Sequence, residues 1–377
     1  MKKTLVALAA LAVVSAASAQ STVTLYGVVD MGIAQLKDST ATANFTKNGV
    51  QQGTMSNSRI GFKGTEDLGG GLKANFVYEL ATNPDEATQT LTNRVGTVGL
   101  SGNFGAVTIG RQYTPYHNVQ LAMDLAGNLN ATPGYVVNNH NFNGGRASNS
   151  VNYQSPSFGG FTAAAQVGAG PATAGTETVV TGGAQADGKS FGLSGIYAAG
   201  PLVAGLAYND VTNPGAQLVG YAPITGGANI AGFGTTAAVA ATATTPAVPA
   251  TNVSTEVKVW AAGASYDFTV VKASLAYSRL TDTKAAATAS ELTSNGYNFS
   301  IAAPLGATTL VANLGRATLK QDSSLLDGTI TGYQLMANYA LSKRTTAYAV
   351  YGNDKLDVNG NEALKRTSTA VGVRHTF

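Results

Sequence analysis

Five basic side chains in the first half of the chain could form a binding site through their types and spacing: Arg59, Lys63, Arg94, Arg111 and Arg146. Guanidinium and ammonium groups attract anions when several of them converge on one space. The set therefore predicts an anion-attracting site rather than a catalytic centre. Whether the groups converge depends on which faces of the surrounding elements they occupy.

Catalytic and metal-binding patterns are absent from the sequence. The chain has no cysteine, and its histidines, His117, His140 and His375, are scattered; residues 117–124, HNVQLAMD, lack the HExxH pairing. EDLGGGLK at 66–73 lacks the GK[ST] ending of a phosphate loop, and no G-x-S-x-G follows a strand-like segment. We predict no catalytic residue, no metal and no cofactor, although the abundance of serine keeps a Ser-His-acid hydrolase conceivable.

The amino terminus has the form of a secretory signal. Lys2 and Lys3 precede an apolar run, and Ala17-Ser18-Ala19 offers a cleavage site, so residues 1–19 are predicted to be a signal peptide. Removing its two lysines from the 23 basic residues leaves 21 against 20 acidic ones, close to neutrality. With no block of like charges, no nucleic-acid partner is predicted.

Alternation of apolar and polar residues dominates the rest of the chain. Leu72, Ala74, Phe76, Tyr78 and Leu80 share one parity, against polar residues such as Lys73 and Glu79 on the other. Period two with one apolar parity indicates strands with one apolar and one polar face. A β-sandwich would show the same period.

The spacing of the segments favours a barrel over a sandwich. Seven tight joins alternate with eight long connections, which gives about 16 strands with every short join at one end. The long connections are expected near residues 35–53, 81–90, 113–146, 170–188, 210–254, 281–291, 320–327 and 353–361. Most segments are about nine to twelve residues long, as a tilted membrane-crossing strand requires. Aromatic residues near segment ends, including Tyr26, Tyr208, Trp260 and Tyr333, fit aromatic girdles at the two water interfaces.

We therefore predict one all-β domain over residues 20–377: a transmembrane antiparallel up-and-down β-barrel. Residues 113–146 have no sustained period and are longer than ordinary connections. We interpret them as a loop folded into the lumen, with an ordinary surface loop as the alternative. Residues 210–254 are predicted to be a long extracellular loop, and no transmembrane helix follows the signal.

Six segments together resemble the general diffusion porins of Gram-negative bacteria, in a form typical of β-proteobacteria. They are TLYGVVDMGI at 24–33, NSRIGFKGTEDLGGGLKANFVYE at 57–79, NRVGTVGLSGNFGAVTIGRQ at 93–112, NSVNYQSPSFGGF at 149–161, YALSKRTTAYAVYG at 339–352 and VGVRHTF at 371–377. The resemblance implies a homotrimer of sixteen-stranded channels for passive diffusion of ions and small hydrophilic solutes, with the third outside loop in each bore. It also implies that Phe377 is read by the outer-membrane insertion machinery. It places the barrel in the outer membrane of a Gram-negative bacterium, with outer-membrane lipid and lipopolysaccharide as the expected surroundings.

Strand parity assigns the basic residues to faces. Ile60 and Phe62 suit lipid, so Arg59 and Lys63 should face the bore; a charge facing lipid at mid-membrane costs about 2–4 kcal/mol. By the same reasoning Val95 and Thr97 are expected outward with Arg94 inward, and Arg146 immediately precedes a strand whose outward residues are Val151 and Tyr153. The porins that the chain resembles carry a basic cluster where Arg59, Arg94 and Arg146 fall; Arg111 stands at a strand end.

A basic wall opposite a weakly acidic loop predicts mild anion preference, because residues 113–146 contribute one acid, Asp124. The alternative is that the arginines pair with lumen acids such as Glu79 and only stiffen the wall. Two other function classes remain open: an adhesin with a blocked lumen, and a barrel enzyme that depends on one histidine. A water-filled bore, expected for this number of strands, disfavours both.

Overall fold

The computed structural model describes residues 22–40, 44–88, 91–126, 145–169, 189–212, 254–284, 291–321 and 327–377. The predicted signal peptide, His140 and nearly all of the predicted loop 210–254 lie outside these residues. Within the described ranges no helix is long and apolar enough to cross a membrane.

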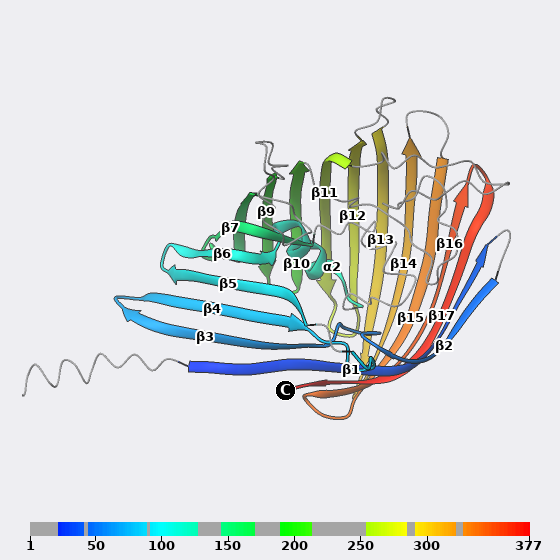
Figure 1. Cartoon of the computed structure of the whole chain (residues 1–377), viewed down its shortest axis with the longest axis horizontal. Helices are drawn as coiled ribbons and strands as arrows, with labels where there is room; N and C mark the ends of the chain where they lie inside the picture. Colours follow the sequence, from blue (N-terminus) through cyan, green and yellow to red (C-terminus); the bar gives the residue numbers. More distant parts are fainter. Residues whose placement is uncertain are drawn as a thin grey trace, which may run out of the picture.

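The described residues form seventeen strands and one helix (Figure 1). In chain order the elements are β1 (Thr22–Thr40), β2 (Asn44–Gln52), β3 (Arg59–Gly69), β4 (Leu72–Ala81), β5 (Thr92–Gly102), β6 (Gly105–Tyr113), α2 (Pro115–Met123), β7 (Arg146–Gln154), β8 (Phe161–Ala169), β9 (Lys189–Ala199), β10 (Leu202–Thr212), β11 (Ser254–Asp267), β12 (Lys272–Lys284), β13 (Glu291–Leu305), β14 (Thr308–Gln321), β15 (Asp327–Ala340), β16 (Thr345–Val358) and β17 (Asn361–Thr376).

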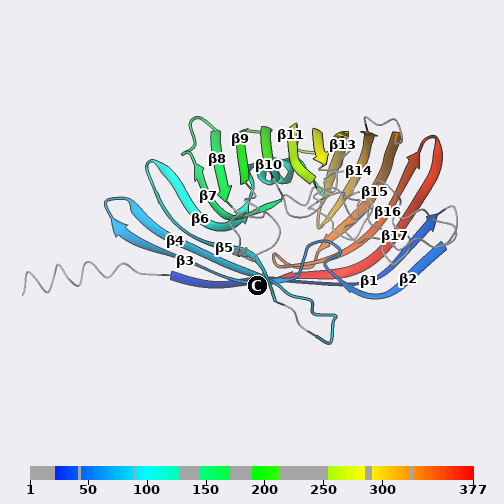
Figure 2. The ribbon, with the colours of Figure 1, turned by 45° about the horizontal axis from the view of Figure 1, so that its top comes forward.

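The strands close into an antiparallel barrel. From β3 onward each strand pairs with its neighbour in sequence, and β17 pairs with β1 from Val28↔Thr376 to Thr40↔Leu364. Figure 2 shows the C-terminal end of the chain beside β1. Closure leaves no strand edge unpaired among the described strands, and an unpaired edge would not be tolerated in hydrocarbon.

Seventeen strands fill sixteen positions in the wall, as predicted. The second half of β1 pairs with β2 (Met31↔Gln52) and its first half pairs with β3 (Val28↔Arg59). β2 and β3 are therefore two parts of one barrel strand, separated by a short excursion over residues 53–58.

The two faces of the wall match the predicted alternation through the membrane. Leu25, Phe62, Val98 and Leu335 are exposed on the outer surface, as a lipid-facing band requires. Trp260 is also exposed there and packs against the ring of Tyr208, which fits the predicted girdle. Tyr26 was wrongly placed in that girdle, because it has the inward parity of β1 and its hydroxyl bonds to Glu79 inside the barrel.

Two of the predicted long connections are mostly strand. Residues 35–53 and 353–361 belong largely to paired parts of β1, β2, β16 and β17, and the second is reduced to a tight turn between β16 and β17. In these extensions the hydrophobic parity is reversed: Leu356 and Leu364 are buried on the inner face, while Lys355 and Lys365 are paired on the outer face. Their outer face meets water instead of lipid, so the membrane pattern ends before the strands do.

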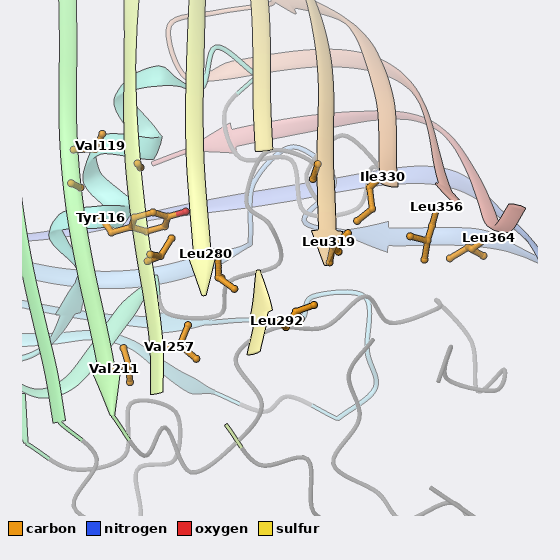
Figure 3. Close-up of a cluster of buried hydrophobic side chains, with 14 residues drawn as sticks. Tyr116, Val119, Val211, Val257, Leu280, Leu292, Leu319, Ile330, Leu356 and Leu364 are labelled. Atoms are coloured by element: carbon orange, nitrogen blue, oxygen red, sulfur yellow. The ribbon is translucent and has the colours of Figure 1, made fainter. Parts of the chain in front are cut away.

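The inner face of this end of the barrel carries the main apolar cluster (Figure 3). Its side chains larger than alanine are Tyr116, Val119, Val211, Val257, Val259, Leu280, Leu292, Leu319, Ile330, Leu356 and Leu364. Tyr116 and Val119 come from α2 and the others from strands β10 to β17. The cluster fixes the helix against the inner wall.

Candidate pore constriction

The described start of the 113–146 insert folds into the barrel, as predicted, and is not an ordinary surface loop. Pro115 stands in the first turn of α2, and the Thr114 hydroxyl caps the helix by accepting a hydrogen bond from the His117 amide (3.2 Å). Tyr116 and Val119 are 1% exposed and pack on the inner wall.

Glycines in the wall make room for the helix. A Cβ atom at Gly205 would meet Val119, and one at Gly263 would meet Met123. The other end of the helix is fixed by the Ser274 hydroxyl of β12, which donates to the Met123 carbonyl (2.7 Å). α2 therefore lies against β9 to β12, whereas the predicted basic residues come from β3, β5, β6 and β7.

Glu79 joins two of the predicted arginines on the inner wall. Its carboxylate lies 2.7 Å from Arg94 Nε and 3.5 Å from Arg59 Nε. The Tyr26 hydroxyl donates to the same carboxylate (3.3 Å). The pairing that we considered as the alternative reading of these arginines is thus present, but one carboxylate serves two guanidinium groups and leaves an excess of positive charge.

Tyr113 connects the next pair of arginines, and the sequence reasoning missed it. Its hydroxyl accepts hydrogen bonds from Arg94 Nη2 (3.1 Å) and Arg146 Nη2 (2.9 Å). The Arg146 guanidinium also lies over the Tyr113 ring, 4.5 Å from the centroid, and His117 stacks on the same ring at 4.6 Å. One phenol thereby holds two like charges together. Its position at the start of the insert, beside Arg111, is the only signal that could have identified it.

His117 is held neutral by this environment. It lies in the insert between two strands, and burial followed by the charges of Arg146 and Arg94 lowers its pKa to about 4. The imidazole therefore adds no charge to the site near neutral pH.

Arg94 reaches the bore through a β-bulge that the parity argument did not foresee. Glu79 pairs with Val95, and the next residue of β4, Leu80, pairs with Asn93, so Arg94 is the extra residue. Val95 consequently faces inward with Glu79 and is 9% exposed, while Val98 is exposed on the outer surface. Arg94 meets Glu79 inside the barrel, whereas Val95 and Thr97 take the inward parity instead of the outward one, a shift of one residue.

The other two predicted basic residues lie at the edges of the cluster. Arg111 pairs across from Gly96, on the outward parity, and donates to the Asn93 carbonyl (3.0 Å) and the Ser148 hydroxyl (2.7 Å). It nevertheless shares a cavity of about 1000 Å³ with Arg94 and Arg146. Lys63 lies further toward the short-turn end, with its ammonium 5.4 Å from the centre of the Tyr26 ring.

The predicted loop acid, Asp124, ends α2 on the wall of β12. Its carboxylate accepts a hydrogen bond from the Ala126 amide (2.8 Å), and the preceding residue, Met123, is the one bonded to Ser274. The acid is thus placed on the helix side of the barrel, apart from the arginine wall.

A second polar group that the sequence reasoning missed surrounds Asp30. Its carboxylate accepts hydrogen bonds from the Tyr348 hydroxyl (2.6 Å) and the Met55 amide (2.8 Å), which fixes the excursion between β2 and β3. Arg374 pairs across from Asp30 and donates to the Ser56 hydroxyl (2.9 Å), adding another guanidinium to the inner wall. An Asp on the inward parity of an otherwise apolar segment was the available signal.

A closed sixteen-strand barrel with an apolar outer face, a helix inside and arginines on the inner wall defines a transmembrane channel of the porin type. The chain belongs to the Gram-negative porin family, whose model matches residues 5–359. It is therefore an outer-membrane channel of a Gram-negative bacterium, and not an enzyme.

Named relatives agree with this membership. The chain is 40% identical over 215 residues to outer membrane porin protein 32 of Delftia acidovorans, an alignment that spans 55% of this chain and 59% of that protein. It is 29% identical to an outer membrane porin protein of Bordetella pertussis over the full length of both.

Solved structures agree on the fold. An anion-selective porin from Comamonas acidovorans superposes with a TM-score of 0.71 at 27% identity, covering 95% of this chain and all of that one. OmpT of Vibrio cholerae, in its trimer form, matches with a TM-score of 0.64 at 15% identity over 95% of this chain and 99% of that one, a likeness of fold alone.

Proposed function

We propose that the barrel is a water-filled channel with weak anion selectivity, through which ions and small hydrophilic solutes diffuse passively. The observation that carries the proposal is the imbalance on the inner wall. Glu79 pairs with Arg59 and Arg94, and Arg146 joins Arg94 through the Tyr113 hydroxyl without a carboxylate of its own in the described contacts. A wall with excess positive charge concentrates anions at the narrowest part of a pore. The likeness to an anion-selective porin supports the same reading.

The zero-current potential across a planar bilayer under a KCl gradient tests the proposal. We expect a mild preference for chloride, and we expect Arg59→Gln with Arg94→Gln to move the potential toward cations. Arg344→Gln, an exposed arginine in the turn before β16, is the matched control and should leave the potential unchanged. A clear cation preference of the unmodified channel would refute the arrangement.

A purely structural role for the arginines gives a different result with Glu79→Gln. If the residual positive charge sets selectivity, removing the one shared carboxylate should increase the preference for anions. If the arginines only stiffen the wall, this variant should weaken the barrel and leave the potential where it was. Gel migration of unboiled samples reports the stability of the fold in the same preparation.

The remaining parts of the proposal concern segments and partners. We propose that residues 1–19 are removed on export, that residues 113–146 form the constriction loop and that 210–254 is extracellular. The proposed partners are two further copies of the chain, outer-membrane lipid with lipopolysaccharide, and the insertion machinery that reads Phe377. Heat-modifiable migration at the size of three chains would support the trimer.

A further inference from the structure

A groove of about 500 Å³ lies on the outer face of the wall over β12 to β16, away from the bore. Tyr297 on one side and Tyr333 on the other form its walls, and Leu314 of the strand between them forms the floor. Each wall is backed by a second ring, with Tyr277 at 5.1 Å from Tyr297 and Tyr351 at 6.0 Å from Tyr333. The result is an apolar slot between two pairs of tyrosines.

The slot ends in a row of polar side chains on the side of the long loops, which is the outer side of the membrane. Arg316, Thr331 and Lys355 are consecutive partners across β14, β15 and β16, which places the backbones of the two basic residues about 10 Å apart. Lys355 already has two carboxylates nearby, Asp357 at 2.9 Å and Glu362 at 3.6 Å. Its charge is therefore compensated.

Arg316 supplies the uncompensated charge of the groove. It is exposed on the outward face, and within the part of the chain that the structure describes it forms no ion pair or hydrogen bond. A guanidinium matches the geometry of a phosphate through two parallel hydrogen bonds. Tyrosine rings with an apolar body and a polar tip are suited to the boundary between headgroups and acyl chains.

We propose that this groove binds one acylated, phosphorylated lipid of the outer leaflet, a molecule of the lipid A class. Its phosphate would lie on Arg316 and one acyl chain would lie over Leu314 between Tyr297 and Tyr333. Free phosphate would gain nothing from the apolar slot, and a neutral lipid would gain nothing from Arg316. The inference rests on the proposed partnership with outer-membrane lipid and lipopolysaccharide, but the site does not touch the bore, so its failure would leave the proposed ion selectivity unaffected.

Native mass spectrometry of delipidated trimer, titrated with diphosphorylated lipid A, measures the binding. We expect Arg316→Ser to weaken it about tenfold, the loss of one charge-assisted contact, and Arg316→Lys to weaken it less. Arg344→Ser, which changes an exposed arginine at the opposite end of the barrel, should bind as the unmodified protein does. Unchanged single-channel conductance of each variant confirms that it is folded.

Two further measurements test whether binding requires both the phosphate and the acyl chains of the lipid. Dephosphorylated lipid A should bind the unmodified protein no better than lipid A binds the Arg316→Ser variant. Inorganic phosphate in large excess should not displace the bound lipid. Equal affinity of the unmodified and Arg316→Ser proteins, or displacement by inorganic phosphate alone, would overturn the proposal.

Discussion

At the scale of single residues, the Tyr113 hydroxyl is the most informative group in the bore. Tyr113→Phe keeps the ring that stacks on His117 and lies under Arg146, and removes only the acceptor shared by Arg94 and Arg146. Hydrogen bonds to charged groups contribute about 1.5–3 kcal/mol each, so we expect the two guanidinium groups to separate. Open-channel current noise should rise while the sign of the zero-current potential stays the same. Tyr153→Phe, which removes an outward hydroxyl bonded to the Phe104 carbonyl, is the control; equal noise in both variants would contradict the role of Tyr113.

The low pKa of His117 predicts acid sensitivity of the inward helix. The pKa of His117 is about 4 in the folded chain and about 6.5 in the unfolded chain, so the unfolded chain binds the proton first as the pH falls. The neutral, buried His117 therefore contributes its full stability above pH 6.5, and that contribution is lost as the pH falls toward 4. The shift corresponds to about 3 kcal/mol at its limit. Hydrogen exchange of the α2 amides, corrected for intrinsic rates, should show loss of protection across this window. His117→Phe preserves the stack without a titrating group, so its protection should vary less; an identical acid response in both proteins would exclude His117 as the cause.

At the scale of elements, close packing on glycine joins the first and last strands. The Tyr348 ring crosses Gly372 and Gly32 to reach the Asp30 carboxylate, and a Cβ at Gly372 would overlap that ring. We expect Gly372→Ala to displace Tyr348 and lower stability by about 1–3 kcal/mol, seen as a lower temperature of heat-modified gel migration. Gly49→Ala adds the same methyl group in β2, where it would meet nothing within 4 Å. A similar midpoint for both variants would show that Tyr348 adapts freely.

The sequence predicts the strands well only inside the membrane, where contact with lipid requires apolar residues at alternate positions. Outward apolar residues such as Phe62 and Leu335 reveal each strand inside the membrane, because the lipid side accepts little else. Above the membrane the outward partners Lys355 and Lys365 alternate with inward Leu356 and Leu364, so paired strands were read as loops. The bulge at Arg94 could not be predicted for another reason. An extra residue in β5 is defined only by its register with β4, and the sequence of one strand does not contain that register.

The sequence predicts which basic residues form the site, but not which groups bond them together. Parity and resemblance to porins identified Arg59, Arg94 and Arg146 on one wall. The Glu79 carboxylate and the Tyr113 hydroxyl are each shared by two arginines that come from different strands. Such contacts between distant segments cannot be predicted from the local sequence of any one segment. Asp124, the one acid of the insert, is expected to face the arginines on charge alone, and its place on the helix side of the barrel depends on how α2 packs on β12.

At the scale of the whole molecule, the last residue completes the cylinder. The amide of Gly27 donates to the Phe377 carbonyl (3.1 Å) and the amide of Phe377 donates to the Gly27 carbonyl (3.2 Å), so the backbone of the final residue closes the wall against β1. The ring packs over Gly27, yet Phe377 remains 41% exposed. Closure therefore rests mainly on backbone bonds, which a change of side chain leaves intact.

Phe377→Ala can therefore test whether the ring acts as a signal for the insertion machinery or helps to close the barrel. If the ring serves mainly as the signal read by the insertion machinery, purified unfolded protein should refold into detergent with nearly the yield of the unmodified chain. Assembly in cells should then fall severalfold, as measured by the amount of heat-modifiable protein in outer-membrane fractions. Phe268→Ala removes a ring of similar exposure, 54%, from the turn between β11 and β12 and should assemble normally. Parallel losses in detergent and in cells would instead assign the ring to barrel closure, because the machinery is absent from the first experiment and the packing over Gly27 is common to both.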